Sequence, residues 1–87
     1  GSSPFSKWFE SLDPIAAGRV ATVIERMADG HRGDCKPVEE GVSERRIDFG
    51  PGYRLYFGQD GRSLILLLLG GTKKRQQSDV SHAKLLW

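Results

Sequence analysis

The stretch SERRIDFGPGYRLYFGQDGRSLILLLL, residues 43–69, decides the fold of this 87-residue chain. It contains three short runs, 43–49, 52–58 and 63–69, whose β-branched, aromatic and aliphatic residues are typical of β-strands. Glycine and proline at 50–52 separate the first two runs, and an Asp-Gly pair separates the second from the third. Connections this short predict three antiparallel strands in a meander.

Two amphipathic helices are expected before the strands. Apolar residues recur every three or four positions within 4–12 and within 14–28. Asp13 followed by Pro14 is a typical helix start, and Ile15 belongs to the apolar stripe of the second helix. The two segments therefore predict a helical hairpin whose apolar faces pack on the sheet.

The segments on either side of the meander are less regular. Residues 31–41 mix glycine, proline and charges without periodicity and predict a loop. Gly70-Gly71 is expected to end the third strand, and Asp79 to cap a final helix. The order helix, helix, strand, strand, strand, helix predicts one α+β domain over residues 4–87, with helices on one face of the sheet. We interpret Gly-Ser-Ser at 1–3 as the remnant of an expression tag.

Composition limits the class of protein. The chain is 38% hydrophobic and 28% charged, as in one small soluble domain. Its longest apolar run, 64–69, is far shorter than the roughly 20 residues of a membrane helix, so no membrane span is expected. The single cysteine, Cys35, cannot form an intramolecular disulfide, which favours a reducing compartment, the cytoplasm.

Charge is distributed unevenly along the chain. Residues 1–41 carry five basic and seven acidic side chains, whereas residues 42–87 carry eight basic and four acidic ones, within a net charge of +2. The basic half therefore predicts an anionic partner. Its cations are expected to cluster on the sheet and just after it: Arg45, Arg46, Arg54, Lys73, Lys74 and Arg75.

Strand alternation predicts which side chains face outward. Arg54 and Tyr56 point to the face opposite Tyr53, Leu55 and Phe57. We expect the more apolar set to face the helices, and Arg54 and Tyr56 to be exposed. A strand arginine can hold a phosphate with two parallel hydrogen bonds, although solvated surface charge is the alternative. We find no metal-ligand spacing, phosphate-cradling glycine loop or Ser/His/Asp set, so no metal or cofactor is expected.

Three stretches carry a resemblance to a known family: VEEGVSERRIDFGPGYRLYF at 38–57, LLLGGTKK at 67–74 and QQSDV at 76–80. Together they resemble the addiction-module killer proteins of the RelE/HigB branch of the RelE/ParE toxin superfamily, and the resemblance covers about residues 5–87. It implies a RelE-like fold and the toxin of a type II toxin-antitoxin system, silenced by a cognate antitoxin. Active members cleave mRNA on the ribosome without a metal.

The resemblance also assigns roles to residues. Arg54 matches the strand arginine that contacts the scissile phosphate, and Arg46 lies where a basic residue of the preceding strand belongs. Lys73, with Lys74 as the alternative, falls at the basic position after the third strand. Tyr56 is the candidate for base contact or proton transfer. The RNA-binding candidates beside these catalytic ones are Arg45, Lys74 and Arg75.

Some positions depart from the family pattern. Asp48 stands roughly where a second strand lysine is found, and Val80 stands at or near a C-terminal tyrosine, for which Tyr56 or His82 could substitute. The family also begins with a β-strand, whereas here residues 1–3 lead almost directly into the first expected helix. We expect that strand to be missing from the sheet, whether it was removed, is disordered or belongs to a different natural start. A sheet short of that strand would expose an edge for a homodimer or for a partner's strand.

Two alternatives to the nuclease remain. A ParE-like inhibitor of DNA gyrase would keep the fold without needing Arg54 beside Arg46. A non-catalytic member would use the basic sheet only to bind an acidic antitoxin segment, and Asp48 and Val80 favour this interpretation.

Overall fold

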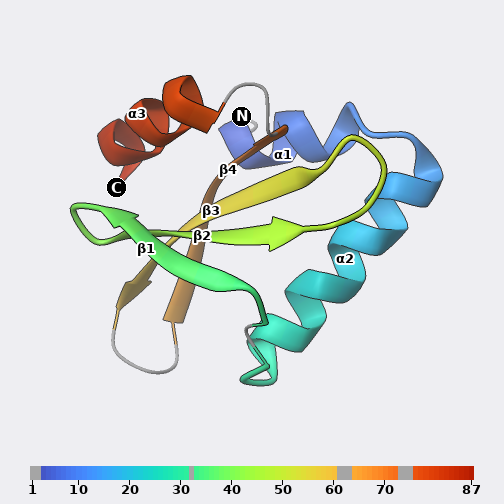
Figure 1. Ribbon diagram of the computed structural model, residues 1–87, viewed down its shortest axis with the longest axis horizontal. Coiled ribbons are helices and arrows are strands. Elements are labelled where there is room, and N and C mark those ends of the chain that lie inside the picture. Colours follow the sequence, from blue (N-terminus) through green and yellow to red (C-terminus); the bar gives the residue numbers. More distant parts are fainter. Residues whose placement is uncertain (1–2, 32, 61–63, 73–75) are drawn as a thin grey trace.

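The computed structural model describes residues 3–31, 33–60, 64–72 and 76–87 of the chain. Two helices come first, four strands follow, and a third helix closes the chain (Figure 1). This confirms the expected α+β fold with an N-terminal helical hairpin, an antiparallel sheet and a C-terminal helix. The elements are α1 Pro4–Glu10, α2 Pro14–Ala28, β1 Cys35–Glu39, β2 Val42–Ile47, β3 Tyr53–Asp60, β4 Leu64–Thr72 and α3 Gln76–Leu86.

The hairpin helices begin at side-chain caps. Asp13 Oδ1 accepts a hydrogen bond from the backbone N–H of Ala16 at 3.0 Å, and Pro14 is the first residue of α2, as the sequence predicts. Helix α2 buries Ala16, Val20 and Met27. Ile15 is 70% exposed, so its place in the apolar stripe was predicted wrongly.

The sheet has four strands in the order β1-β2-β3-β4, all antiparallel to their neighbours. The sequence predicted three, because β1 was expected to be part of a loop. Strand β1 lies at an edge of the sheet and is largely exposed, so its residues follow no apolar alternation, and an edge strand tolerates Pro37. The ladder shifts register between Pro37 and Glu39.

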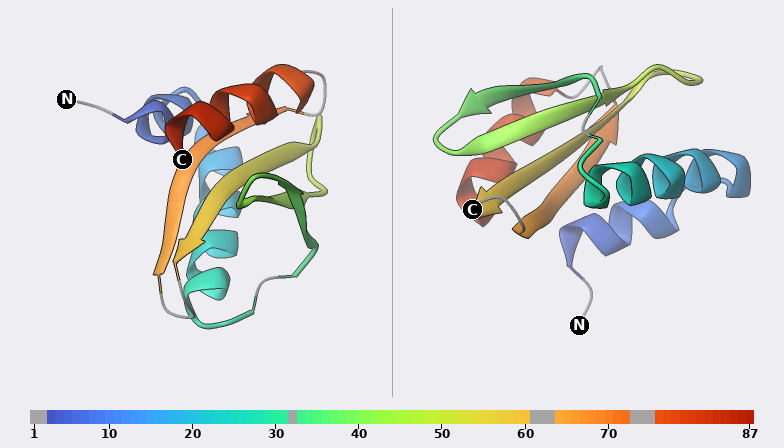
Figure 2. Two further views of the ribbon diagram at one scale, coloured as in Figure 1. Left: turned by 90° about the vertical axis from the view of Figure 1, so that its left-hand side faces the viewer. Right: turned by 90° about the horizontal axis from the view of Figure 1, so that it is seen from below.

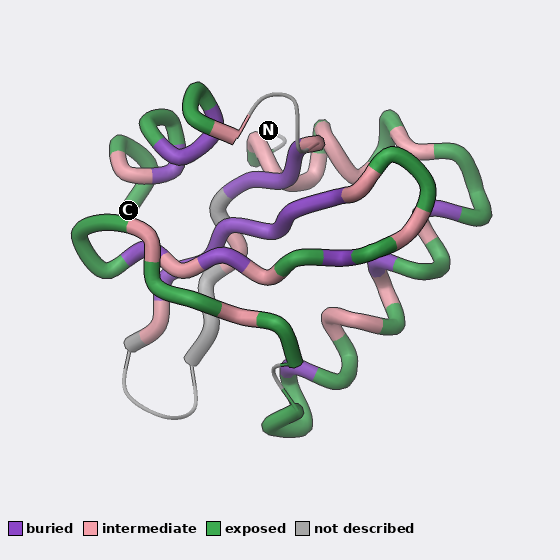
Figure 3. The backbone as a smooth tube through the Cα atoms, in the orientation of Figure 1, coloured by how far each residue is buried: buried purple, intermediate pink, exposed green. Residues whose placement is uncertain are grey.

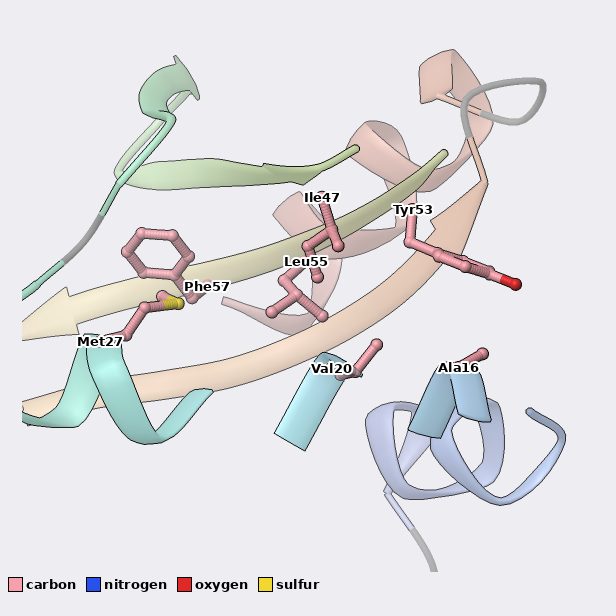
Figure 4. Close-up of a cluster of buried hydrophobic side chains, with 7 residues drawn as sticks. All are labelled: Ala16, Val20, Met27, Ile47, Tyr53, Leu55 and Phe57. Atoms are coloured by element: carbon pink, nitrogen blue, oxygen red, sulfur yellow. The ribbon is translucent and has the colours of Figure 1, made fainter. Parts of the chain in front are cut away.

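Helices cover both faces of the sheet, not one. Tyr53, Leu55 and Phe57 of β3 pack with buried residues of α2 (Figure 4). On the opposite face Tyr56 packs with Val80 and Ala83 of α3, together with Val42 and Leu69. The sheet therefore lies between the hairpin and α3 (Figure 2), and β3 is buried along most of its length (Figure 3). The expectation that Arg54 and Tyr56 are exposed is wrong because α3 folds over that second face.

Two glycines near the end of β4 allow helices α1 and α3 to approach the sheet closely. The strand runs on to Thr72, so Gly70-Gly71 does not end it. A methyl group on Gly70 would lie 2.0 Å from a ring carbon of Trp8, and one on Gly71 would lie 1.9 Å from Oδ2 of Asp79. The pair therefore accepts α1 on one face and α3 on the other.

Gly70→Ala is expected to destabilise the protein by about 1 to 3 kcal/mol, because the rigid Trp8 ring has no room for the added methyl group. Gly18→Ala is the matched control. Gly18 lies inside α2 with nothing within 4 Å of the added methyl, so it should stabilise by about 0.5 to 1 kcal/mol. Urea unfolding measures both, and midpoints that shift in the same direction would contradict this account.

Candidate functional site

Arg46 and Arg54 lie directly opposite each other on neighbouring strands. The register of β2 and β3 pairs the two residues, so their side chains leave the same face of the sheet. Both line a pocket of about 320 Å³. The predicted juxtaposition of these two arginines is therefore confirmed. The remaining residues that line the pocket are Asp34, Ile47, Asp48, Gly52 and Tyr53.

The glycines of the β2–β3 turn shape one end of this pocket. Gly50 and Gly52 have φ values of 56° and 85°, which an L side chain adopts only under strain. The turn brings Asp48 and Tyr53 to the pocket wall beside the arginines. The expected connection between the two strands at Gly50-Pro51-Gly52 is confirmed.

Arg54 is buried and paired with a carboxylate. Only 8% of the residue is exposed, and Nη1 donates a hydrogen bond to Oε1 of Glu44, which is fully buried. Gln76 of α3 donates from Nε2 to Oε2 of the same carboxylate at 2.9 Å. One carboxylate thus joins β2, β3 and α3. We define Glu44, Arg54 and Gln76 as the Glu44 network.

Arg46 is exposed and has a carboxylate partner of its own. Its Nε and Nη2 donate to Oδ2 and Oδ1 of Asp34, each at 3.0 Å, in a bidentate ion pair. Like charges directly opposite on neighbouring strands repel. The two carboxylates, Glu44 and Asp34, offset this repulsion between Arg46 and Arg54.

The Asp34 carboxyl should titrate below its ordinary pKa of 3.8, chiefly because it accepts hydrogen bonds from Arg46. Because the folded-state pKa is lowered, the stabilisation is complete above the unfolded pKa and is lost as the pH falls through the folded one. Carboxyl ¹³C NMR titration measures the pKa. In Arg46→Ala it should rise toward 3.8, and an unchanged value would contradict the assigned pair.

Tyr56 lies under α3 and is fully buried. Its hydroxyl has no hydrogen-bond partner among the described residues. Burial, and then the negative charges of Glu44 and Asp79, raise the pKa of this hydroxyl above its ordinary value of 10.0. In this structure Tyr56 is covered from solvent and from any RNA base, and it stays protonated at neutral pH.

Arg45 does not join the other two arginines. It pairs with Leu55 in the ladder and so leaves the opposite face of the sheet. There its guanidinium donates to the backbone carbonyl of Arg46 and lies beside Gly33. The other predicted site residues, Lys73, Lys74 and Arg75, lie outside the described residues.

Sequence reasoning missed three polar residues near Arg54: Glu44, Gln76 and Asp79. Asp79 was expected to cap the final helix, but α3 begins at Gln76 and Asp79 is a buried residue of its first turn. One signal could have revealed them. The continuous apolar run of residues 64–69 predicts a strand covered on both faces, and a covered second face buries the charges that alternate along its neighbours.

Among the described residues, no group of three or more His, Cys, Asp or Glu side chains is placed to hold a metal ion. No helix in the described parts of the chain is long and apolar enough to cross a membrane.

A protein of Haemophilus influenzae described as uncharacterized is 40% identical to this chain over 83 residues, which cover 94% of the chain and 84% of the relative. The chain belongs to the same family as this protein. No family model matches the chain, and no solved structure matches it.

Proposed function

We propose that this protein is the toxin of a type II toxin-antitoxin system and cleaves mRNA on the ribosome as a metal-independent endoribonuclease. The observation that carries the proposal is the pair of arginines, Arg46 and Arg54, which face each other across two strands and line one pocket. The resemblance of residues 38–57, 67–74 and 76–80 to RelE/HigB toxins supports the same reaction.

The reaction needs concentrated positive charge. The RNA 2′-hydroxyl loses its proton and attacks the adjacent phosphorus, while the bond from phosphorus to the 5′-oxygen breaks and that oxygen takes up a proton. The products are a 2′,3′-cyclic phosphate and a 5′-hydroxyl. The intermediate bears extra negative charge on the phosphoryl oxygens, which guanidinium groups stabilise through paired hydrogen bonds.

The two arginines are suited to different parts of this task. Arg46 is exposed, and a phosphate can compete with Asp34 for it because that ion pair faces solvent. Arg54 is held by the buried Glu44 and contributes a fixed charge to the pocket wall. We therefore assign Arg46 to capture of the phosphate and Arg54 to stabilisation of the transition state, with Lys73 in support.

Such a toxin works in the cytoplasm, where mRNA and ribosomes are, and an antitoxin protein silences it there. In the described residues the outer strands β1 and β4 each pair with one neighbouring strand. An open strand edge accepts a strand from another chain. We expect the antitoxin, or a second copy of this chain, to use one of these edges.

A non-catalytic, antitoxin-binding member is the second candidate. The observation that favours it is that both arginines already have carboxylate partners, Asp34 and Glu44. A third carboxylate, Asp48, also lines the pocket.

Cleavage of mRNA on programmed ribosomes tests the proposal. Wild-type protein should cut the message in the ribosomal A site and leave a 5′-hydroxyl on the downstream fragment. A DNA gyrase supercoiling assay runs beside it. Intact mRNA would overturn the nuclease proposal, and inhibited supercoiling would then support the ParE-like alternative.

A further inference from the structure

Glu44 is a buried carboxylate that contacts Arg54 of the candidate site. It is 0% exposed, and both of its oxygens accept hydrogen bonds, one from Arg54 and one from Gln76. The three members of the Glu44 network come from β2, β3 and α3. Neither Glu44 nor Gln76 lines the pocket to which Arg54 contributes.

A carboxylate in such a place requires a counter-ion. Removing an ionised group from water is strongly unfavourable unless a partner of opposite charge and further hydrogen bonds replace the water. Arg54 supplies the charge and Gln76 supplies a second donor. The same contacts restrict the Arg54 guanidinium to an orientation in which Nη1 faces Glu44.

We propose that Glu44 is a positioning residue that fixes the Arg54 guanidinium at the pocket, with Gln76 linking that orientation to α3. The inference rests on the proposed nuclease function for its effect on rate. Glu44 does not itself touch the substrate, because it is fully buried and does not line the pocket. It acts only through Arg54, and this distinguishes it from a general base.

A double-mutant cycle on single-turnover cleavage tests this role. Glu44→Gln keeps the size of the side chain and an acceptor oxygen but loses the charge, and should slow cleavage by up to about 100-fold through misplacement of Arg54. In an Arg54→Ala background the same change should have no further effect, within about twofold. Glu39→Gln, at an exposed carboxylate of β1, is the matched control and should cleave like wild type.

Two outcomes of the cycle would overturn the proposal. If Glu44→Gln slows cleavage equally in the presence and absence of Arg54, Glu44 acts independently of Arg54. If Glu44→Gln cleaves like wild type, the orientation of Arg54 does not depend on the Glu44 charge. Far-ultraviolet circular dichroism should show that each variant is folded under the assay conditions.

A spectroscopic measurement separates this inference from the proposed function. In wild type, the Arg54 side-chain N–H protons should give separate NMR signals that exchange slowly with water, because the guanidinium is buried and hydrogen-bonded. In Glu44→Gln these signals should broaden or merge. Unchanged signals, or wild-type signals that are already averaged, would overturn the proposal. If wild type cleaves no mRNA, the nuclease proposal fails, and the NMR result still decides whether Glu44 positions Arg54.

Discussion

Arg54→Ala is expected to slow ribosome-dependent mRNA cleavage by about 100- to 1,000-fold, the usual loss when one charge-stabilising donor is removed from an active site. The effect should be large because Arg54 lies directly opposite Arg46 at the pocket, where it is buried and paired with Glu44. Single-turnover cleavage of a defined message at saturating protein measures the rate of the chemical step.

The matched control for this experiment is Arg26→Ala. Arg26 lies in the last turn of α2, is exposed, and does not line the pocket. The Arg26→Ala substitution removes the same charge from the protein as Arg54→Ala but leaves the site unchanged. Cleavage by this variant should therefore stay within about twofold of wild type. If both variants lose activity equally, total charge and not Arg54 is responsible, and the assigned site is wrong.

Glu44→Ala is expected to destabilise the fold by about 3 to 5 kcal/mol, the cost of leaving one member of a buried ion pair without its partner. The guanidinium of Arg54 would remain buried without its counter-ion, and Gln76 would lose its acceptor. This loss is a large share of the about 5 to 15 kcal/mol that stabilises a typical domain. Urea unfolding followed by tryptophan fluorescence measures it.

A variant that removes both charges tests the reason for this loss. Changing Glu44 and Arg54 together to methionine replaces the pair by apolar side chains, which is often neutral or stabilising for a buried ion pair. The double variant should therefore recover most of the stability that Glu44→Ala loses. If it is as unstable as Glu44→Ala, an unpaired charge is not the cause of the destabilisation.

The sequence predicted those elements whose signals are local. Asp13 with Pro14 marks the start of α2, and the runs around Gly50-Pro51-Gly52 become neighbouring strands. Strand β1 was not predicted, because an edge strand packs few side chains and so needs no alternation of apolar and polar residues. Its pairing with β2 is specified by backbone hydrogen bonds, which leave little trace in residue type.

The sequence predicted that the strands of Arg46 and Arg54 are neighbours, but neither the register of these strands nor the burial of Arg54. The predicted runs extend to 49 and start again at 52, whereas in the structure the ladder ends at Ile47 and Tyr53, and this longer connection places Arg46 opposite Arg54. Their environments depend on contacts far apart in the chain. Gln76 reaches Glu44 across 32 residues, and Asp34 reaches Arg46 across 12. Periodicity indicates which residues share a face, but it does not show that a distant helix will cover it.

The two glycines at the end of β4 also determine the register in which β4 pairs with β3. The leucine-rich run before them is nearly uniform, so sliding β4 along β3 by one residue would exchange one aliphatic side chain for another along most of its length. Side-chain identity there offers little resistance to such slippage. Gly70 leaves space for the Trp8 ring and Gly71 for Asp79. A one-residue slip would force Leu69 against Trp8 in one direction, or Thr72 against Asp79 in the other. The smallest residues of the strand therefore fix the alignment of its largest ones.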